Sequence, residues 1–291
     1  MTSHSPMPAV SKLAVRNLRM MHLLERLAIA FEEARVPVIA LKGAALNLTL
    51  YERADDRPMD DLDLLIRPST IHAATRVLEK LGAVAGGSEE RNSLFPRFHY
   101  ETQYVLGSLH PVKVDLHVRP FRPMRYARTV PQDALWDRAV SCRVGHSSIL
   151  IPSAEDLLLQ VAVHVAVHGF SRPMWLEDVG RWLVARGRSL HWAAFLKRVE
   201  AWCLALPVRE AFARLAPEGR AIVPAWVADT LGIAPTSWRD RRTLAQAPHD
   251  AERPILHVLT NVLCTPDLRF VLSYVYALGS RGRRRNQTDR Y

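Results

Sequence analysis

The chain has 291 residues, of which 48% are hydrophobic and 23% are charged, and this globular composition excludes wholesale disorder. Lys and Arg outnumber Asp and Glu by 39 to 29, and the formal net charge of +10 favours anionic partners without choosing among them. The longest apolar run, residues 157–167, contains two polar residues and is shorter than the roughly 18 residues of a transmembrane helix, so we expect no membrane partner.

Helical and extended segments are predicted to alternate along the first half of the chain. Apolar positions recur at helical spacing across residues 10–34, and the apolar, partly β-branched segment 36–41 indicates a short buried strand. The segments predicted next are a short helix at 44–51, a strand at 61–67, a helix at 68–81, and strands at 98–106 and 112–118. Residues 52–58 and 83–93 are expected to form loops, the second of them mobile. The first half is therefore predicted to be an α+β unit with a small mixed sheet and helices packed against it.

The pattern changes after Pro152, beyond which no convincing strand signal occurs. Ser153 is expected to cap the first of several helices, predicted at 154–168, 175–186, 192–206 and 255–278. These patterns divide the chain into an α+β domain with an N-terminal helix at residues 1–150, a helical domain at 151–280, and a basic flexible tail at 281–291.

Two aspartates form the sharpest local pattern. In residues 59–66 the alternation of a strand directs Asp61 and Asp63 to one face and the intervening leucines to the core, while Asp60 is expected to point to the opposite face. Two carboxylates about 6–7 Å apart along a strand repel each other, and a divalent cation between them removes this repulsion. Because Mg²⁺ takes one or two carboxylates plus substrate phosphates, the pair predicts a metal site, with two solvated acids at a strand end as the alternative.

A third acid lies on the predicted strand at 112–118, where Lys113, Asp115 and His117 share the polar face. If this strand lies beside the first one, Asp115 joins the two other carboxylates. Three carboxylates can hold two metals, one for an attacking hydroxyl and one for a triphosphate, as in-line transfer at phosphorus requires. His117 is expected to hydrogen-bond Asp115 or a substrate, or to be a buried structural partner.

The turn Leu41-Lys42-Gly43-Ala44 lies between the predicted strand at 36–41 and the next helix. Glycine allows the backbone to come close to a ligand, and a helix N-terminus offers free N–H groups to a phosphate. Lys42 adds a positive charge beside them. The value of this short motif lies in its position just before the aspartate pair.

Together these residues resemble the polymerase-beta-type nucleotidyltransferases, and most closely their uncharacterised bacterial branch. That branch carries Leu-Lys-Gly, then a Tyr, then an Arg shortly before Asp-x-Asp, and later an acid-hydrophobic-His strand. The matching residues here are Leu41-Lys42-Gly43, Tyr51, Arg57, Asp61-Leu62-Asp63 and Asp115-Leu116-His117. Spaced histidines ahead of a Trp-Leu-x-Asp segment are matched by His164, His168 and Trp175-Leu176-Glu177-Asp178. The resemblance spans residues 36–185.

The resemblance implies a nucleotidyltransferase-type α+β fold, with a small mixed sheet and flanking helices followed by an all-helical C-terminal part. It implies transfer from a nucleoside triphosphate with Mg²⁺, or alternatively Mn²⁺, as the cofactor. The catalytic and metal-binding residues that it implies are Asp61, Asp63 and Asp115. Lys42 and the Gly43 backbone would hold the triphosphate, assisted by Arg57. The wider superfamily places a serine after the glycine, whereas this chain has Ala44, so one hydroxyl contact to phosphate is missing.

Further candidate cleft residues are His117, His164, His168 and Asp178. His164 and His168 share one helix face, and with Asp178 they could form a metal site or a proton relay, although hydrogen-bonded core histidines are the more common case. Asp178 is also a candidate general base for an acceptor hydroxyl. The tryptophans of the predicted helices are more typical of a core than of a base-stacking platform: Trp175, Trp182, Trp192 and Trp202.

The first functional hypothesis is a Mg²⁺-dependent nucleotidyltransferase that moves a nucleoside monophosphate onto an acceptor hydroxyl. The sequence does not identify the acceptor: a small molecule, a peptide, a protein side chain and a nucleic-acid end all remain open, and nucleic acid is not favoured. One alternative is a catalytically weak nucleotide-binding or protein-interaction module of the same fold. Another, less favoured, is a nucleic-acid-binding protein, suggested by the net charge and the arginine-rich tail.

The cysteines and the N-terminus bear on the compartment. Cys142, Cys203 and Cys264 are far apart, a spacing that fits neither a disulfide framework nor a zinc site. The first apolar segment carries charged residues throughout, unlike a secretory signal. A cytoplasmic location is therefore expected.

Overall fold

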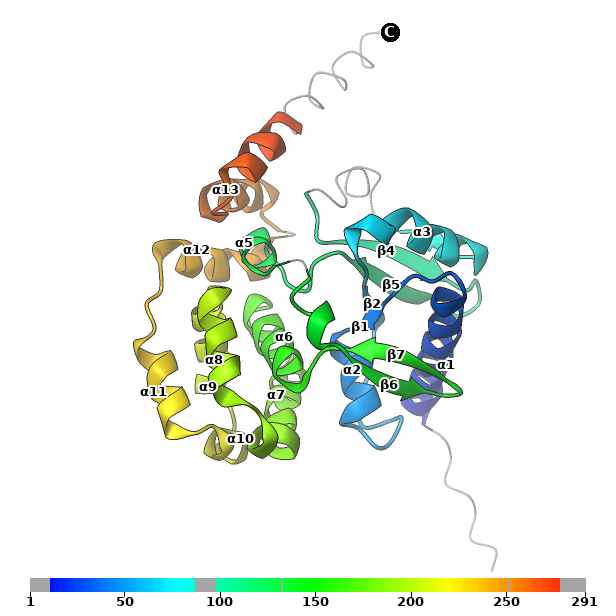
Figure 1. Ribbon diagram of the computed structural model, residues 1–291, viewed down its shortest axis with the longest axis horizontal. Helices are drawn as coiled ribbons and strands as arrows, with labels where there is room; N and C mark the ends of the chain where they lie inside the picture. The colour runs from blue at the N-terminus through cyan, green and yellow to red at the C-terminus, as the bar shows by residue number, and fades with distance from the viewer. Residues whose placement is uncertain (1–10, 87–97, 132, 251, 278–291) are drawn as a thin grey trace, which may run out of the picture.

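The structure, a computed structural model, describes residues 11–86, 98–131, 133–250 and 252–277. A mixed sheet with its own helices lies on one side of the molecule, and a larger group of helices from the C-terminal half lies on the other (Figure 1). This arrangement confirms the predicted α+β fold class with a helical C-terminal part.

Within the described residues the sheet has seven strands in the order β3-β4-β5-β2-β1-β7-β6. Their bounds are β1 Ile39–Ala40, β2 Asp61–Leu65, β3 Val84–Ala85, β4 Glu101–Leu106, β5 Val112–His117, β6 Val140–Val144 and β7 Ser147–Ile151. At the centre, β2 runs parallel to β5 and antiparallel to β1. The register of β2 and β5 pairs Asp63 with Asp115. The first strand is shorter than predicted, because only two residues of 36–41 enter the sheet.

Helices α1 (Lys12–Glu33), α2 (Lys42–Thr49) and α3 (Ile71–Lys80) confirm the three helices predicted for this half. The hydroxyl of Ser11 caps α1 by accepting a hydrogen bond from the N–H of Ala14. The long α1 packs against α3 and against strands β6 and β7. The short α2 contacts both β2 and the first helix of the C-terminal half, and so connects the two parts of the molecule.

Two features of the sheet differ from the prediction. The segment 83–93, predicted as a loop, contains the two-residue strand β3, and residues 87–93 lie outside the described residues. The hairpin of β6 and β7 was not predicted. Strand β6 lies at the sheet edge, where only Val144 of its five residues is buried, so its hydrophobic alternation is weak.

The C-terminal half is helical, and no strand follows Ile151 in the described ranges. Its helices, with the short α5 that precedes β6, are α5 Met124–Thr129, α6 Ala154–Val167, α7 Pro173–Arg186, α8 Trp192–Ala201, α9 Ala205–Ala213, α10 Pro217–Ile222, α11 Ala225–Ile233, α12 Trp238–Gln246 and α13 Pro254–Cys264, followed by helical residues 268–277. The helix predicted at 192–206 is split where Cys203 takes a positive φ of 56°. The helix predicted at 255–278 is split at Thr265, which is extended because Pro266 follows it.

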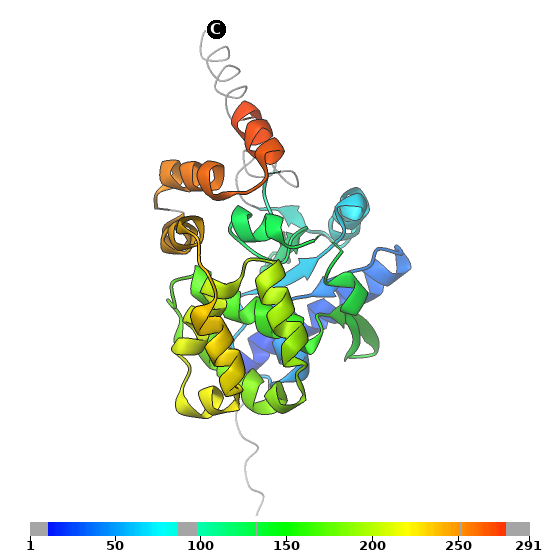
Figure 2. The ribbon, with the colours of Figure 1, turned by 60° about the vertical axis from the view of Figure 1, so that its left-hand side comes forward.

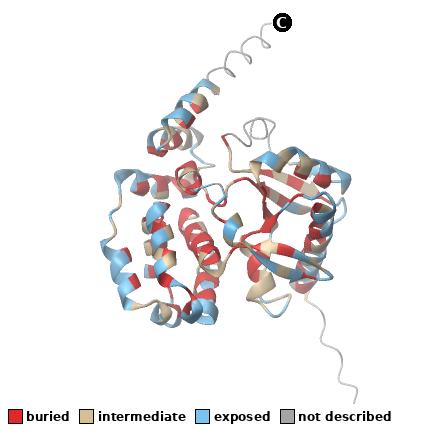
Figure 3. Ribbon diagram, viewed as in Figure 1, coloured by how far each residue is buried: buried red, intermediate tan, exposed pale blue. Residues whose placement is uncertain are grey.

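Helix α6 lies at the centre of the hydrophobic core. It contacts α2, α7, α8 and α9, and buried residues colour almost its whole length in Figure 3. From residue 156 to 167, only His164 is not buried. The main core cluster continues from the sheet into the helices across residue 150, and the turned view in Figure 2 shows the two parts in contact. The predicted domain division at residue 150 stays a prediction.

Two sequence expectations concern the remaining segments. In the part of the chain that the structure describes, none of the helices is both long enough and apolar enough to span a bilayer. The basic tail predicted at 281–291 lies outside the described residues.

Candidate active site

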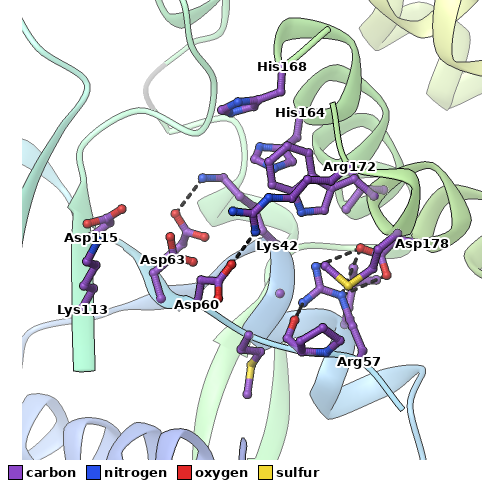
Figure 4. A pocket seen from close by; sticks show the side chains of 18 of the residues that line it. Lys42, Arg57, Asp60, Asp63, Lys113, Asp115, His164, His168, Arg172 and Asp178 are labelled. Atoms are coloured by element: carbon purple, nitrogen blue, oxygen red, sulfur yellow. Dashed lines mark hydrogen bonds and ion pairs between the residues drawn. The ribbon is translucent and has the colours of Figure 1, made fainter. Parts of the chain in front are cut away.

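A cavity of about 550 Å³ lies between the sheet and the helices α6 and α7 (Figure 4). Residues of both halves of the chain line it. Every site residue predicted from the sequence lines this cavity except His117, which lies just behind Asp63: Lys42, Gly43, Arg57, Asp61, Asp63, Asp115, His164, His168 and Asp178. The fold therefore brings together residues that are spread over more than 130 positions of sequence.

The carboxylates of β2 and β5 share one face of the sheet. Because the two strands are parallel and Asp63 is opposite Asp115, the alternation places Asp61 on that face as well. Strand β4 extends this face, since its register places Glu101 opposite His117. Sequence reasoning missed Glu101, although the alternation of buried and partly exposed residues in β4 was available as a signal.

Asp63 is the most strongly bound of these carboxylates. Its Oδ1 accepts a hydrogen bond from Nζ of Lys42 at 2.6 Å and lies 2.7 Å from Nε2 of His117. Burial opposes the charge of Asp63, but the nearby Lys42 and His117 outweigh it and hold the pKa of this carboxyl well below its usual range. His117 therefore hydrogen-bonds Asp63 and not Asp115. Among the described residues, Oδ2 of Asp63 has no hydrogen-bond partner and is available to a ligand.

The two other aspartates are crowded by negative charge. Burial and the charge of Asp63 raise the pKa of Asp61 to about 7, although Lys42 acts in the opposite direction. Burial, Glu101 and Asp63 also raise the pKa of Asp115, whose Oδ1 accepts a hydrogen bond from Nε2 of Gln103 at 3.0 Å. The acidic face therefore carries more negative charge than the neighbouring lysine neutralises.

A divalent cation would relieve this crowding. Among the described residues, the Asp61 side chain has no hydrogen-bond partner and Asp63 has a free Oδ2, so the two side chains offer unused carboxylate oxygens of the kind that Mg²⁺ binds. Within the described ranges, no group of three or more His, Cys, Asp or Glu side chains is arranged to hold an ion. The donor set thus fits a site of two carboxylates that a substrate phosphate completes.

The first two residues of α2, Lys42 and Gly43, line this cavity. Lys42 has a positive φ of 44°, and its N–H donates to Oε1 of Gln160 on α6 at 3.0 Å. A Cβ atom at Gly43 would lie only 2.7 Å from Nη1 of Arg57, so a larger residue there would displace this guanidinium. The glycine predicted for its approach to phosphate therefore also gives room to Arg57.

Arg57 and Asp178 form an ion pair between the loop before β2 and α7. Nε and Nη2 of Arg57 donate to the two carboxylate oxygens at 2.8–3.0 Å, and the hydroxyl of Tyr51 donates to Oδ1 at 2.6 Å. Arg57 and Asp178 are only 5% and 2% exposed. Both oxygens of Asp178 are thus already hydrogen-bonded, an arrangement that suits a structural partner of Arg57 better than the general base predicted from sequence.

The position of Asp60 differs from the prediction. It was expected to point away from the acidic pair, but it lines the same cavity and pairs with Arg16 of α1, at 2.7 Å, and with Arg172 just before α7. Asp60 precedes the first residue of β2, so the strand alternation does not govern its direction. Neither arginine carried a recognisable motif in the sequence, because each is placed here by tertiary packing.

His164 and His168 form a cluster with Trp175 on the helical wall of the cavity. The ring centroids of Trp175 lie 4.4 Å from those of His164 and 4.9 Å from those of His168. Trp175 was predicted to be a core residue, but it is only partly buried and lines the cavity. Burial, together with the charges of Arg122 and Lys42, lowers the pKa of His168 to about 3, and burial with Lys42 lowers that of His164 well below its usual value. Both rings are therefore neutral at pH 7.

These lowered pKa values make the stability of the fold depend on pH. Between pH 3 and 6.5 the unfolded chain binds more protons at His168 than the folded chain does, so stability is lost as the pH falls below 6.5. For His168 the loss between pH 6.5 and 5 is up to about 2 kcal/mol, and the lowered pKa of His164 acts in the same direction.

We expect the variant His164→Asn/His168→Asn to lose less stability between pH 7 and pH 5 than the wild type does, as measured by urea unfolding at both pH values. His72→Asn on the exposed side of α3 is the matched control and should follow the wild type. Equal losses in the double variant and the wild type would contradict neutral histidines at this wall.

Comparisons with known proteins identify a family that covers most of the chain. The model of a family described as uncharacterised nucleotidyltransferase matches residues 8–216. A search of the curated proteins finds no match.

Three solved structures are similar to this chain at 15–16% identity. The crystal structure of ANT(2″)-Ia in complex with adenylyl-2″-tobramycin has a TM-score of 0.45 and 16% identity, and the match covers 62% of this chain and 98% of that one. The solution structure of the antibiotic-resistance factor ANT(2″)-Ia has a TM-score of 0.43 and 15% identity, with 67% and 95% covered. An antigenic nucleotidyltransferase-like protein from Paracoccidioides brasiliensis has a TM-score of 0.42 and 16% identity, with 61% and 78% covered.

Proposed function

The chain belongs to the family of uncharacterised nucleotidyltransferases, and from this premise we propose that it moves a nucleoside monophosphate from a nucleoside triphosphate to an acceptor hydroxyl, with Mg²⁺ bound by Asp61 and Asp63. The observation that carries the proposal is the acidic face of β2 and β5, where Asp61, Asp63 and Asp115 line one cavity and where burial and neighbouring carboxylates raise the pKa values of Asp61 and Asp115.

Asp61 and Asp63 are the residues that would hold the metal. They offer the unpartnered carboxylate oxygens described above, and the phosphates of the nucleotide would complete the coordination. When bound, Mg²⁺, or alternatively Mn²⁺, supplies the positive charge that stabilises the triphosphate during transfer. His117 keeps Asp63 in place from behind through its hydrogen bond to Oδ1.

Lys42 and Gly43 are proposed to receive the triphosphate. The Lys42 ammonium is bound to Asp63 at 2.6 Å, and the positive charge is favoured there because the surrounding acids raise its pKa against the effect of burial. A triphosphate brought in with a divalent cation would offer Lys42 a second anionic partner at the same place. The N–H groups at the start of α2 lie beside Lys42 and are also available to the phosphates.

Asp115 is proposed to act on the acceptor. It lies on the same face as the metal-binding pair but at the neighbouring strand, next to Gln103 and Lys113. Its raised pKa suits a group that takes a proton from an acceptor hydroxyl. The prediction that Asp115 is a third metal ligand stays open beside this role.

Arg57 is proposed as a positioning residue. Because its guanidinium is bound to Asp178 and lies against Gly43, it holds the phosphate-binding turn at a fixed distance from α7. It would thereby assist triphosphate binding through the backbone of the turn.

The proposal predicts transfer that depends on a divalent metal. Protein incubated with each of the four α-³²P-labelled nucleoside triphosphates, Mg²⁺ and fractionated cell extract should transfer the label to one fraction and release an equal amount of pyrophosphate. Removal of the metal with EDTA should slow both by at least about a hundredfold, because the metal contributes several kcal/mol to the stabilisation of the charge. Excess Mg²⁺ should restore the rate.

The other outcomes separate the alternatives. Nucleotide binding without transfer to any small-molecule, peptide or protein fraction would favour a catalytically weak nucleotide-binding module. Retention on DNA or RNA that falls steeply with salt and is unchanged by Asp63→Asn would favour the nucleic-acid-binding alternative. Label transfer at an undiminished rate in EDTA would contradict the role of Mg²⁺.

A further inference from the structure

The helical wall of the cavity carries three aromatic rings that the proposed chemistry does not use. His164, His168 and Trp175, here called the ring cluster, pack with centroid distances of 4.4–4.9 Å. The histidines come from consecutive turns of α6 and its C-terminal cap, and the tryptophan comes from α7. All three are partly exposed and line the cavity that also holds the acidic face. They form a continuous aromatic surface inside a polar site.

A planar group, the guanidinium of Arg172, already lies on this surface. The guanidinium of Arg172 lies 5.1 Å from the centroid of the Trp175 ring, and the same guanidinium pairs with Asp60. A planar, delocalised group therefore has access to the ring from the cavity side. The Arg172 and Asp60 side chains are 53% and 47% exposed, so the ion pair is weak and can be displaced.

The ring cluster lies within reach of the phosphate end of the cavity. His164 is close enough to Lys42 and Asp63 for both charges to act on it, and the close-up view shows His164 and His168 beyond the Lys42 side chain on the same side of the cavity (Figure 4). A ligand anchored by its phosphates at Lys42 can thus extend a planar ring towards α6 and α7. The acidic strands lie on the opposite side.

We propose that the ring cluster, with the guanidinium of Arg172, is the nucleobase-binding surface of the triphosphate site. The base stacks on Trp175 in the place that Arg172 holds, and Arg172 moves off the ring while it stays paired with Asp60 or turns to the phosphates. Aromatic and guanidinium planes are the groups that stack on bases irrespective of their sequence. The neutral imidazoles offer both a donor and an acceptor to the base edge. This inference rests on the proposed function, because it places the base of the same nucleotide.

Trp175→Leu tests the inference through binding instead of turnover. Dissociation constants for ATP and for inorganic tripolyphosphate are measured by isothermal titration calorimetry in the presence of Ca²⁺, together with tryptophan fluorescence. We expect ATP, but not tripolyphosphate, to quench the wild-type fluorescence. The variant should bind ATP about tenfold more weakly and bind tripolyphosphate as the wild type does, since a stacked base contributes about this much. Trp175→Phe should retain most of the ATP affinity.

Trp226→Leu is the matched control, because Trp226 is a half-exposed tryptophan on α11 that does not line this cavity. It should change neither affinity. If Trp175→Leu fails to fold, His168→Ala carries the same comparison between ATP and tripolyphosphate. Unchanged ATP affinity in the variant, or equal wild-type affinities for ATP and tripolyphosphate, would overturn this inference but leave the proposed function standing. Failure of the wild type to bind either ligand would overturn the proposed function as well.

Discussion

Replacement of Asp63 by asparagine is expected to reduce the metal-dependent release of pyrophosphate by about a thousandfold. Asparagine preserves the size of the side chain and an oxygen for His117, but it removes the negative charge. A metal contributes several kcal/mol of charge stabilisation, and about 4 kcal/mol corresponds to a thousandfold change in rate. The effect is measured as the rate of pyrophosphate release. The assay contains the acceptor fraction that the label-transfer experiment identifies.

The central position of Asp63 makes this the largest effect on activity that we expect. Its Oδ1 is shared by Lys42 and His117, and its charge also influences Asp61 and Asp115. Loss of the charge therefore removes a metal ligand and leaves the buried ammonium of Lys42 without its closest counterion. Circular dichroism should show that the variant remains folded.

Asp229→Asn is the control for this substitution. Asp229 is an exposed aspartate on α11, far from the acidic face in sequence, and its replacement changes the net charge by the same amount. This control should retain wild-type activity. A folded Asp63→Asn protein that keeps more than a tenth of the wild-type rate would contradict the assignment of Asp63 as a metal ligand.

The second large effect is expected on stability. Substitution of Asp178 by asparagine should destabilise the fold by about 3–5 kcal/mol, because it leaves the buried guanidinium of Arg57 without its charged partner. For a chain of this size the loss corresponds to a decrease of roughly 5–8 °C in the melting temperature. Thermal unfolding followed by circular dichroism measures it.

Two comparisons make this prediction specific. Arg53→Ala breaks the ion pair between Arg53 and Asp55, in which the arginine side chain is 74% exposed, and should leave the melting temperature close to that of the wild type. The double variant Arg57→Met/Asp178→Leu, which removes both charges, should be more stable than Asp178→Asn. A decrease of less than 2 °C in Asp178→Asn would show that the pair does not hold the two halves together.

The sequence predicted the local parts of the site well because strand alternation is a local property. The spacing of Asp61 and Asp63, and that of Asp115 on its own strand, determines which side chains share a face once the strands pair. The Lys42-Gly43 turn was recognisable for the same reason, since it lies directly between a strand and a helix. Edge strands such as β6 gave no comparable signal because most of their side chains are exposed.

The parts of the site that depend on the approach of distant segments could not be predicted from one sequence. Asp60 and Arg172 are 112 positions apart, and their contact exists only because the start of α7 lies at the same cavity as the start of β2. Likewise Trp175 resembles a core residue on a helix, and only the position of α7 opens its ring to the cavity. Helix breaks at Cys203 and Thr265 also redirect the C-terminal helices in ways that periodicity does not encode.

Amino-acid order alone thus determined the acidic strands, the Lys-Gly turn, the capped helix at Ser153 and the family resemblance, because each depends on neighbours within a few residues. Tertiary structure decided which oxygen of Asp63 is occupied, that Asp178 is bound to Arg57, and that two neutral histidines and a tryptophan face the acids across one cavity. The physical reason is that charge, burial and hydrogen bonding are set by whatever group lies nearest in space, and a single sequence does not specify that neighbour.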